Sequence, residues 1–562
     1  MSVPPVTVIE VQTGQTRPAP SSGPSSPIGN GKKPRLEEPS PPVPGPSSSA
    51  ANPKKSHKKL ARKAKKKGQH VTPEAYSNED ILWHDVESVL GKEVVDAAVE
   101  AGTEWDAPFE FREEVEVEVH SMASNGDGLA LAPAPRQHWV VIVPQALPGE
   151  KVRARVYRSS RLHSVADLVS VDVPNAEMRD MSRVKCKYFG TCAGCQYQML
   201  SYDTQLDLKR TVVVKAYQNF SNIPEETMPS ILGTIASPLQ YGYRTKITPH
   251  FEAPPKKVQK AGRPSEEDDT TQPNWLKIGF NQIGKRITMD IEDCPIATPV
   301  LTQAYGPMRE NIVKNVYSYK KGVSLLLRDS IDVKAEDTHA AGEEPHVCIT
   351  DHRATVRERV GDMLFEYTAG SFFQNNNSVL VPLTDYVRDA IVSPSGSASS
   401  QSPPTHLVDA YCGAGLFAIM LSPHFTTIAG IELSSDSIAS ATRNATLNHI
   451  PATKCSFRAG DAAAIFAAVP DFPPNETALI IDPPRKGTDE NFIEQLISFG
   501  ARTVVYVSCN VHTQARDVGM ILRKSEEHAG QDGQRYRLES IRGFDLFPQT
   551  AHVESVAVLR LA

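Results

Sequence analysis

The sequence predicts an α/β protein with a doubly wound parallel sheet at its C-terminal end, preceded by a small β-barrel and a mixed α+β central domain. Residues 406–420 have the pattern of a strand, a glycine turn and a helix, which is the first unit of such a sheet. Residues 503–507 form an unbroken apolar run, typical of a strand buried on both faces. Residues 114–171 instead show the period-two alternation of half-buried strands.

Residues 1–75 are rich in Pro, Ser, Gly and Lys and have few large apolar side chains, so they are predicted to be disordered. Basic clusters lie within this tail at 31–35 and 54–67. The larger cluster suits a nuclear import signal or an RNA-binding arm, and for either cluster a solubilising tail is the plain alternative. The net charge of −6 averages over these clusters and over acidic stretches, so it excludes few partners.

The chain has 8 Cys and neither an apolar leader nor an apolar run near ~20 residues, which predicts an intracellular protein with reduced thiols and no membrane segment. The Lys-rich tail favours the nucleus and/or the cytoplasm as its location. Residues 76–110 carry apolar side chains at helical spacing and are predicted to be a helical linker.

The next predicted unit, residues 111–175, contains several short alternating strands joined by turns at 125–128 and 148–150. So many short strands in so few residues close most economically into a barrel. The unit resembles the OB-like RNA-binding barrel that precedes many RNA-modifying domains. The residues expected to contact phosphates are Arg153, Arg155, Arg158 and Arg161. A barrel used only for packing is the alternative.

Two further units complete the predicted organisation. Residues 180–370 form the mixed central domain, which is interrupted by an exposed insertion at 252–273. Residues 371–562 form the doubly wound domain, with a Ser- and Pro-rich loop at 393–404.

The glycine turn at 411–415 predicts a cofactor site. A second strand ends at Glu432, an acid placed to accept hydrogen bonds from ribose hydroxyls. A site for NAD would prefer a third glycine where this chain has Ala418, and the loop also carries Tyr411, so S-adenosyl-L-methionine fits better. Asp461, at the end of a third strand, suits the adenine amino group, and a plain helix cap is its alternative role.

Five short motifs, taken in order, resemble those of the RNA uracil-C5 methyltransferases over roughly residues 110–562. They are Phe372-Phe373-Gln374-Asn375-Asn376, Asp409-Ala410-Tyr411-Cys412-Gly413-Ala414-Gly415, Asp482-Pro483-Pro484-Arg485-Lys486-Gly487, Ser508-Cys509-Asn510 and His552-Val553-Glu554. The resemblance implies a Rossmann-like class I methyltransferase domain. Leu416 departs from bacterial members, which commonly have Asn there, so a side-chain hydrogen bond to the cofactor is lost or replaced.

The chemistry of uracil explains these residue types. C5 is a poor nucleophile until a thiolate adds to C6, and Cys509 is the predicted nucleophile, at an ordinary thiol pKa that would require little help. Glu554 is the predicted base that removes the C5 proton. By resemblance, Gln374 and Asp482 contribute to the cofactor site. Arg485 stands where amino-group methyltransferases have an aromatic residue, which favours carbon methylation.

Four thiols of the central domain predict a metal site. Their spacing suits zinc or an iron-sulfur cluster equally. The rRNA-directed branch of the resembled family carries a cluster on this pattern, which favours a 4Fe-4S cluster, and merely buried thiols are the metal-free alternative. The four residues are Cys186, Cys192, Cys195 and Cys294.

Together these features predict an enzyme that methylates uridine in tRNA at C5, forms the ribothymidine (5-methyluridine) of the T-loop, and acts as a monomer. The alternative substrate is rRNA, which the four-Cys pattern favours. An alternative of another class is a non-catalytic RNA-binding or tRNA-folding protein. The complete set of motif residues argues against that alternative.

Overall fold

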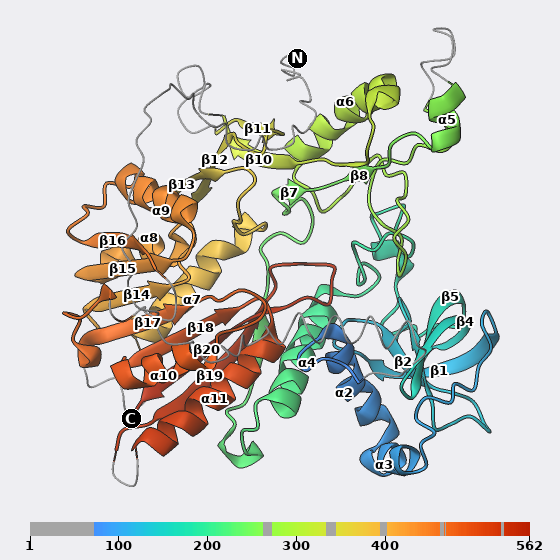
Figure 1. The fold of residues 1–562 in the computed structure, drawn as a ribbon, viewed down its shortest axis with the longest axis horizontal. Coiled ribbons are helices and arrows are strands. Elements are labelled where there is room, and N and C mark those ends of the chain that lie inside the picture. Colours follow the sequence, from blue (N-terminus) through green and yellow to red (C-terminus); the bar gives the residue numbers. More distant parts are fainter. Residues whose placement is uncertain are drawn as a thin grey trace, which may run out of the picture. The chain divides into compact units, whose positions relative to one another are not determined.

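The computed structural model describes residues 72–261, 272–332, 344–393, 402–460, 466, 468–529 and 533–562 (Figure 1). The predicted disordered tail and its basic clusters lie outside these residues, and so does Asp461. The chain divides into two units, Met1–Thr72 and Pro73–Ala562, and the account below concerns the second. No helix of the described residues is long and apolar enough to cross a bilayer.

The described part begins with two helices, α2 (Asn78–Leu90) and α3 (Lys92–Glu100). The hydroxyl of Ser77 caps α2 by accepting a hydrogen bond from the backbone amide of Asp80. Trp83 and other apolar residues of these helices share one hydrophobic core with the strands that follow. The predicted helical linker is therefore a layer packed against the barrel.

Five strands close into a barrel in the order β1-β2-β3-β5-β4 (Figure 1). Along β1 exposed glutamates alternate with buried valines, because successive side chains of a strand point to opposite faces. The predicted barrel is thus confirmed. The strands are β1 (Glu114–Met122), β2 (Gly128–Leu131), β3 (Val140–Val143), β4 (Lys151–Ser160) and β5 (His163–Val173).

Within the described residues, the central region contributes helices α4 (Tyr202–Phe220), α5 (Lys256–Ala261) and α6 (Pro299–Asn315) and several short sheets. Helix α6 packs with β7 and the loops around it into a separate apolar core. The short strands are β7 (Lys246–Ile247), β8 (His250–Phe251), β9 (Val323–Ser324), β10 (Leu327–Ile331), β11 (His346–Ile349), β12 (Thr355–Val360) and β13 (Met363–Thr368). Helix α5 begins the predicted insertion.

The C-terminal domain is built on an eight-stranded sheet in the order β16-β15-β14-β17-β18-β20-β19-β6. The first five are parallel and β20 runs antiparallel to β18, which confirms the predicted doubly wound architecture. The strands are β14 (His406–Ala410), β15 (Thr427–Glu432), β16 (Cys455–Ala459), β17 (Thr477–Ile481), β18 (Thr503–Ser508), β19 (Tyr536–Phe544), β20 (Glu554–Leu561) and β6 (Leu232–Ile235).

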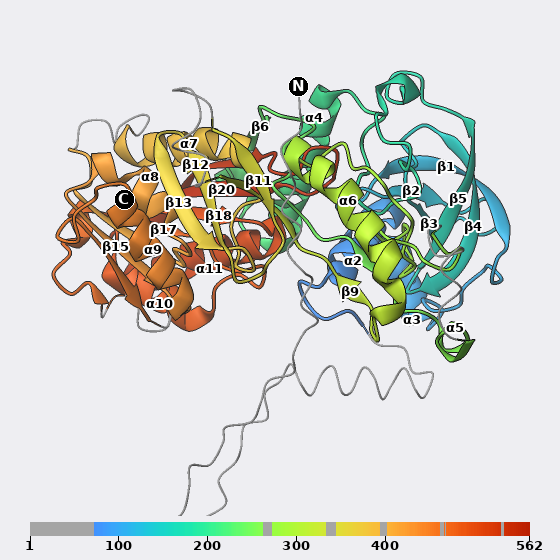
Figure 2. The ribbon, with the colours of Figure 1, turned by 90° about the horizontal axis from the view of Figure 1, so that it is seen from above.

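Helices cover both faces of this sheet, as Figure 2 shows for α7 and α11 on opposite sides. Helices α7 (Leu380–Val392) and α8 (Leu416–Met420) pack on one face, and α4 (Tyr202–Phe220), α10 (Glu490–Phe499) and α11 (Val511–Ala529) on the other. Helix α9 (Ser435–Leu447) follows β15. Because both faces are covered, β17 and β18 are buried at every position, as continuous apolar runs require. Helix α4 and β6 come from the predicted central domain, yet they join this sheet.

Candidate active site

The candidate site lies at the carboxyl ends of the parallel strands. Strands β14, β15, β17 and β18 run in the same direction, so the motifs that follow them meet at one edge of the sheet. Strand β20 is antiparallel, so its first residue, Glu554, lies at that same edge. The topology therefore gathers segments that are up to about a hundred and fifty residues apart.

The turn after β14 has the backbone expected for close approach to a ligand. Gly413 and Gly415 have φ of +54° and +89°, in the left-handed region that glycine adopts without strain. A Cβ added to Gly413 would meet nothing within 4 Å, so the backbone there is open. The backbone amide of Gly413 donates to Oε2 of Glu432 at 3.3 Å. The structure thus places Glu432 directly beside the turn, as the predicted cofactor site requires.

Tyr411 precedes this turn with φ of +62°, and its ring centroid lies 5.6 Å from that of Phe492. Leu416, which follows the turn, does not offer a polar group to a cofactor. It packs into an apolar core with Phe373 and Ile419. Leu416, which stands where bacterial members commonly have Asn, therefore packs the turn against the loop that carries Gln374.

Asp409 is a buried acid of this turn that the sequence did not single out. Its Oδ2 accepts a hydrogen bond from the amide of Ala418 at 2.9 Å, while Oδ1 has no partner among the described residues. Burial raises the pKa of Asp409 to about 8, and the charges of Asp482 and Glu432 add to the shift. Asp409 could have been found from the sequence, because it is an acid inside an otherwise apolar strand that leads into a glycine turn.

The other two predicted cofactor residues flank the same edge. Gln374 is buried, in a loop tied to the central region by a hydrogen bond of 2.9 Å from the amide of Thr245 to the carbonyl of Asn375. Asp482 follows β17, and its amide donates to the carbonyl of Ala410 at 3.3 Å. Burial raises the pKa of Asp482 to about 7.

The register of β18 and β20 brings Cys509 and Glu554 together. Ser508 is paired with Ser555 in this antiparallel ladder, so Cys509 directly follows the last paired residue of β18 and Glu554 directly precedes its partner on β20. The charge of Glu554 also raises the pKa of the Cys509 thiol, which places the two side chains near each other. The predicted nucleophile and the predicted base are therefore neighbours, although forty-five residues separate them.

Burial opposes the charged form of both groups. Burial raises the pKa of the Cys509 thiol to about 11, and the charges of Glu554 and Asp482 contribute. Burial, with a contribution from Asp482, raises the pKa of Glu554 to about 8. The expectation of an ordinary thiol pKa was wrong, because the thiol lies half-buried among acids. The thiolate therefore requires a nearby positive charge.

Arg485 supplies that charge. Its guanidinium hydrogen-bonds to the thiol of Cys509 and lowers the pKa of both Cys509 and Glu554, against the effect of burial. Its backbone carbonyl accepts hydrogen bonds from Nδ2 of Asn510 at 2.9 Å and from Oγ1 of Thr513 at 3.2 Å. The loop after β17 is thus tied to the loop after β18, and Arg485 is held beside the thiol.

The four thiols of the central region lie near one another without forming a metal-binding arrangement. Burial raises the pKa of Cys195 to about 12, and the other three thiols add to the shift, so the four lie near one another. Nevertheless, no group of three or more His, Cys, Asp or Glu side chains in the part of the chain that the structure describes is arranged to hold an ion. Neither a 4Fe-4S cluster nor zinc is supported by this geometry.

The arginines of the barrel are largely engaged by other side chains. Arg153 and Arg155 on β4 pair with Glu116 and Glu114 on β1 at 2.8 and 2.6 Å. Arg161 stacks over the ring of Trp83 at 4.2 Å. A ladder of exposed cross-strand ion pairs neutralises this face, which weakens the prediction that these arginines bind phosphate.

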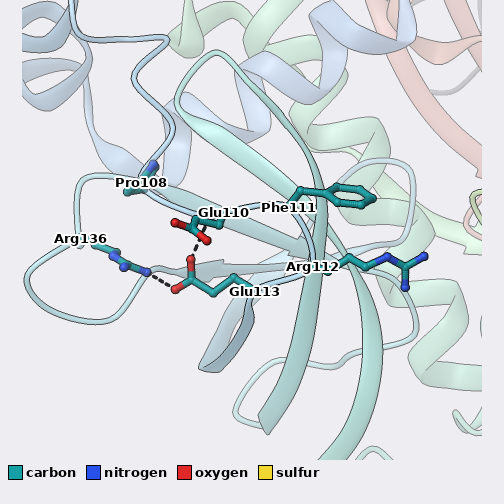
Figure 3. Close-up of a pocket in the computed structure, with 6 residues that line it drawn as sticks. All are labelled: Pro108, Glu110, Phe111, Arg112, Glu113 and Arg136. Atoms are coloured by element: carbon teal, nitrogen blue, oxygen red, sulfur yellow. Dashed lines mark hydrogen bonds and ion pairs between the residues drawn. The ribbon is translucent and has the colours of Figure 1, made fainter.

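A solvent-open hollow on the barrel also lies outside the candidate site (Figure 3). In it, a carboxylate oxygen of Glu113 accepts a hydrogen bond from the Glu110 amide at 2.8 Å, and Glu113 also pairs with Arg136. Phe111 and Arg112 point away from these acids. None of the motif residues lines the hollow.

The fold and the edge of its sheet define a class, the S-adenosylmethionine-dependent methyltransferases. The crystal structure of a Pyrococcus abyssi tRNA (uracil-54, C5)-methyltransferase in complex with S-adenosyl-L-homocysteine has the same fold, with a TM-score of 0.53 and 22% identity. The likeness covers 79% of this chain and 100% of that one.

Sequence relatives define the family within this class. A family model described as tRNA (Uracil-5-)-methyltransferase matches residues 347–561. A Schizosaccharomyces pombe tRNA (uracil(54)-C(5))-methyltransferase is 42% identical over 89% of this chain and 86% of its own length. Its Saccharomyces cerevisiae counterpart is 36% identical over 86% and 78%. The chain belongs to the tRNA (uracil-5-)-methyltransferase family, which confirms the predicted resemblance.

Proposed function

We propose that this protein transfers a methyl group from S-adenosylmethionine to C5 of a uridine in tRNA, the uridine at position 54 of the T-loop. The observation that carries the proposal is the proximity of Cys509 and Glu554 at the end of the β18–β20 ladder, in a chain of this family. The two relatives named above carry uracil-54 of tRNA in their names, which supports the same target here.

The reaction begins at the thiol. The Sγ of Cys509, as the thiolate beside Arg485, adds to C6 of uracil, and the electrons of the C5–C6 double bond move into the enolate of C5 and O4. C5 then takes the methyl group, and S-adenosylhomocysteine leaves. Glu554, in its carboxylate form, takes the proton from C5, the C5–C6 double bond re-forms, and the thiolate of Cys509 departs.

The environment of Glu554 suits this last step. A general base works best when its pKa lies near the operating pH, and burial raises the pKa of Glu554 to about 8. An ordinary glutamate would be a much weaker base for a carbon acid. The burial that raises the pKa of Glu554 therefore also makes its carboxylate an effective base.

The target base has to leave its stack to reach the half-buried thiol. Extruding an unpaired or loop nucleotide costs less than extruding a paired one, which favours a tRNA loop as the substrate. The metal site remains a prediction, and no step of the proposed reaction uses it.

The proposal is tested with tRNA transcripts and S-adenosylmethionine labelled in its methyl group. The wild-type protein should place label at C5 of one uridine, and Cys509→Ala should place none. Cys348→Ala is the matched control, because Cys348 is a half-buried thiol on β11, outside the site. Label transferred at a normal rate by Cys509→Ala would overturn the mechanism, and wild-type protein that leaves the tRNA transcripts unlabelled would overturn the substrate.

A further inference from the structure

The loop between β19 and β20, residues 545–552, leads directly into Glu554, and a buried lysine of α4 holds both of its ends. Nζ of Lys209 donates to Oδ1 of Asp545 at 2.7 Å and to the carbonyl of Phe547 at 3.0 Å. The same Nζ donates to the carbonyl of His552 at 2.6 Å. The ammonium group of Lys209 therefore donates all three of its hydrogen bonds to this loop, two near its start and one near its end.

Lys209 and Asp545 form a fully buried ion pair, with both side chains 0% exposed. Asp545 is fixed in turn, because its Oδ2 accepts a hydrogen bond from the hydroxyl of Tyr202 at 2.9 Å. A buried charge persists only where its partner and its remaining hydrogen bonds are in place. The geometry around Nζ is therefore tightly determined.

A second residue of α4 holds the middle of the loop. Oε1 of Gln205 accepts from the backbone amide of Gln549 at 3.0 Å, and Nε2 of Gln205 donates to Oε1 of Gln549 at 3.1 Å. The hydroxyl of Tyr243 donates to the carbonyl of Pro548 at 3.0 Å. The loop has no regular structure of its own, so these contacts from outside define its path.

Glu554 depends on this path more than on contacts of its own. Its Oε2 has no hydrogen-bond partner among the described residues, although the side chain is buried. Its backbone is held on one side by pairing with Phe544 of β19, the residue directly before Asp545, and on the other by the loop that precedes it. The carbonyl of His552, two residues earlier, is the last point at which Lys209 contacts that backbone.

We infer that Lys209 is a positioning residue for the proton-abstraction step: by fixing both ends of the 545–552 loop it sets where the Glu554 carboxylate meets C5 of the substrate. This inference rests on the proposed function. A displacement near 1 Å can cost about 100-fold in the rate of a step that requires close approach. Attack by Cys509 and methyl transfer precede this step and do not use Glu554.

The inference has a distinctive consequence for the covalent intermediate. When only proton abstraction is slowed, the methylated adduct between Cys509 and the RNA still forms, but it is released slowly. The ratio of covalent adduct to free methylated RNA then rises. A purely structural defect lowers the amount of active protein and leaves this ratio unchanged.

The test uses the double variant Lys209→Met/Asp545→Asn in the full chain, because Lys209→Met alone would leave a buried unpaired carboxylate. The control is Lys215→Met/Asp85→Asn. Lys215 also lies on α4 and donates to Asp85 at 2.8 Å and to the carbonyl of Met122 at 2.7 Å, on the barrel side. Adduct and free methylated RNA are separated on denaturing gels after reaction with labelled S-adenosylmethionine.

We expect the ratio to rise tenfold or more in Lys209→Met/Asp545→Asn, to rise further in Glu554→Gln, and to stay at the wild-type value in the control. If the wild-type protein and Glu554→Gln behave as expected while the Lys209 double variant keeps the wild-type ratio, this inference alone fails. A wild-type protein that forms no adduct would instead remove the proposed function.

A second variant guards against a folding defect. Lys209→Gln/Asp545→Asn keeps a donor opposite position 545, and melting curves report whether each variant is folded. We expect a smaller rise of the same ratio in this variant. Unfolding of both double variants would assign Lys209 to stability alone and would overturn the inference.

Discussion

At the scale of single residues, burial raises the pKa of three acids of the site. The pKa of Asp409 and of Glu554 is raised to about 8 and that of Asp482 to about 7, each mainly by burial. An unfolded glutamate loses its proton near 4.5, so the folded state binds the extra proton between that pH and about 8. Stability contributed by these protonated acids is present at low pH and is lost as the pH rises through about 8.

We therefore predict that Glu554→Gln makes the protein more stable at high pH while abolishing turnover. Above pH 8 the wild-type protein has to bury a charge at this position, whereas the amide stays neutral, so melting should occur about 2 °C or more above the wild-type value. Near pH 5 the two proteins should melt together. Turnover should fall about 100-fold or more. Equal melting temperatures at pH 9 would show that Glu554 is not buried as a neutral acid.

A second prediction concerns the charge beside the thiol. Replacing Arg485 with Met removes the group that lowers the pKa of Cys509, and each unit of increase in a pKa reduces the thiolate fraction about tenfold. The rate of adduct formation, followed by rapid quenching, should therefore fall about tenfold or more.

Lys486→Met is the matched control for Arg485→Met, because Lys486 is the next residue of the same loop and is exposed. Arg485 is exposed as well, but of the two only Arg485 lowers the pKa of the thiol, so removing Lys486 should leave adduct formation within about twofold of the wild-type rate. An equal loss in both variants would mean that the positive charge acts on RNA binding rather than on the thiol.

At the scale of elements, the sequence predicted each strand better than it predicted how the strands pair. The apolar run of β18 and the glycine turn after β14 are local signals, because a doubly covered strand and a left-handed turn each restrict the residues that can occupy them. The pairing of β18 with β20 spans about fifty residues and has no local signal. Family resemblance supplied the roles of Cys509 and Glu554, and the register supplied their contact.

Long-range contacts of charged residues were equally hidden. The four barrel arginines suggested an RNA surface, but the strand register sets Arg153 and Arg155 against Glu116 and Glu114. Likewise, Lys209 gave no signal in the sequence, because the partner that makes it buried lies more than three hundred residues away. Contacts of this kind depend on the tertiary fold alone.

The barrel offers the third prediction. Arg153→Gln/Arg155→Gln should change the affinity for tRNA less than about twofold, because exposed ion pairs already neutralise both side chains. Glu114→Gln/Glu116→Gln frees the same arginines and should tighten binding. It should also steepen the dependence of log K on log salt by up to about 2. A clear loss of affinity and a shallower salt dependence in the arginine variant would restore these residues to the RNA interface.

At the scale of the whole molecule, α4 links the barrel to the catalytic sheet. Its Lys215 contacts Asp85 beside the barrel, and its Lys209 holds the loop that leads to Glu554. A glycine of the barrel, Gly126, lies so close to Ala551 of that loop that an added Cβ would come within 2.7 Å of it. The barrel, the central region and the catalytic domain are thus in direct contact around one loop.

The choice between tRNA and rRNA is also a question about the whole molecule, since the chemistry of the site suits uridine in either. We predict that cells lacking this protein lose 5-methyluridine from tRNA and keep it in rRNA. Mapping 5-methyluridine in total RNA measures both at once. Loss from rRNA alone would transfer the proposed chemistry to the alternative substrate.

The central claim is that Cys509 adds to C6 of a tRNA uridine and that a C5 proton then has to leave. A tRNA transcript made with 5-fluorouridine tests it most directly, because Glu554 cannot remove fluorine as it removes a proton. With S-adenosylmethionine present, we predict a stable adduct, and mass spectrometry should find the methylated fluorouridine on the peptide that contains Cys509. The absence of any adduct, or an adduct on another cysteine, would contradict the account.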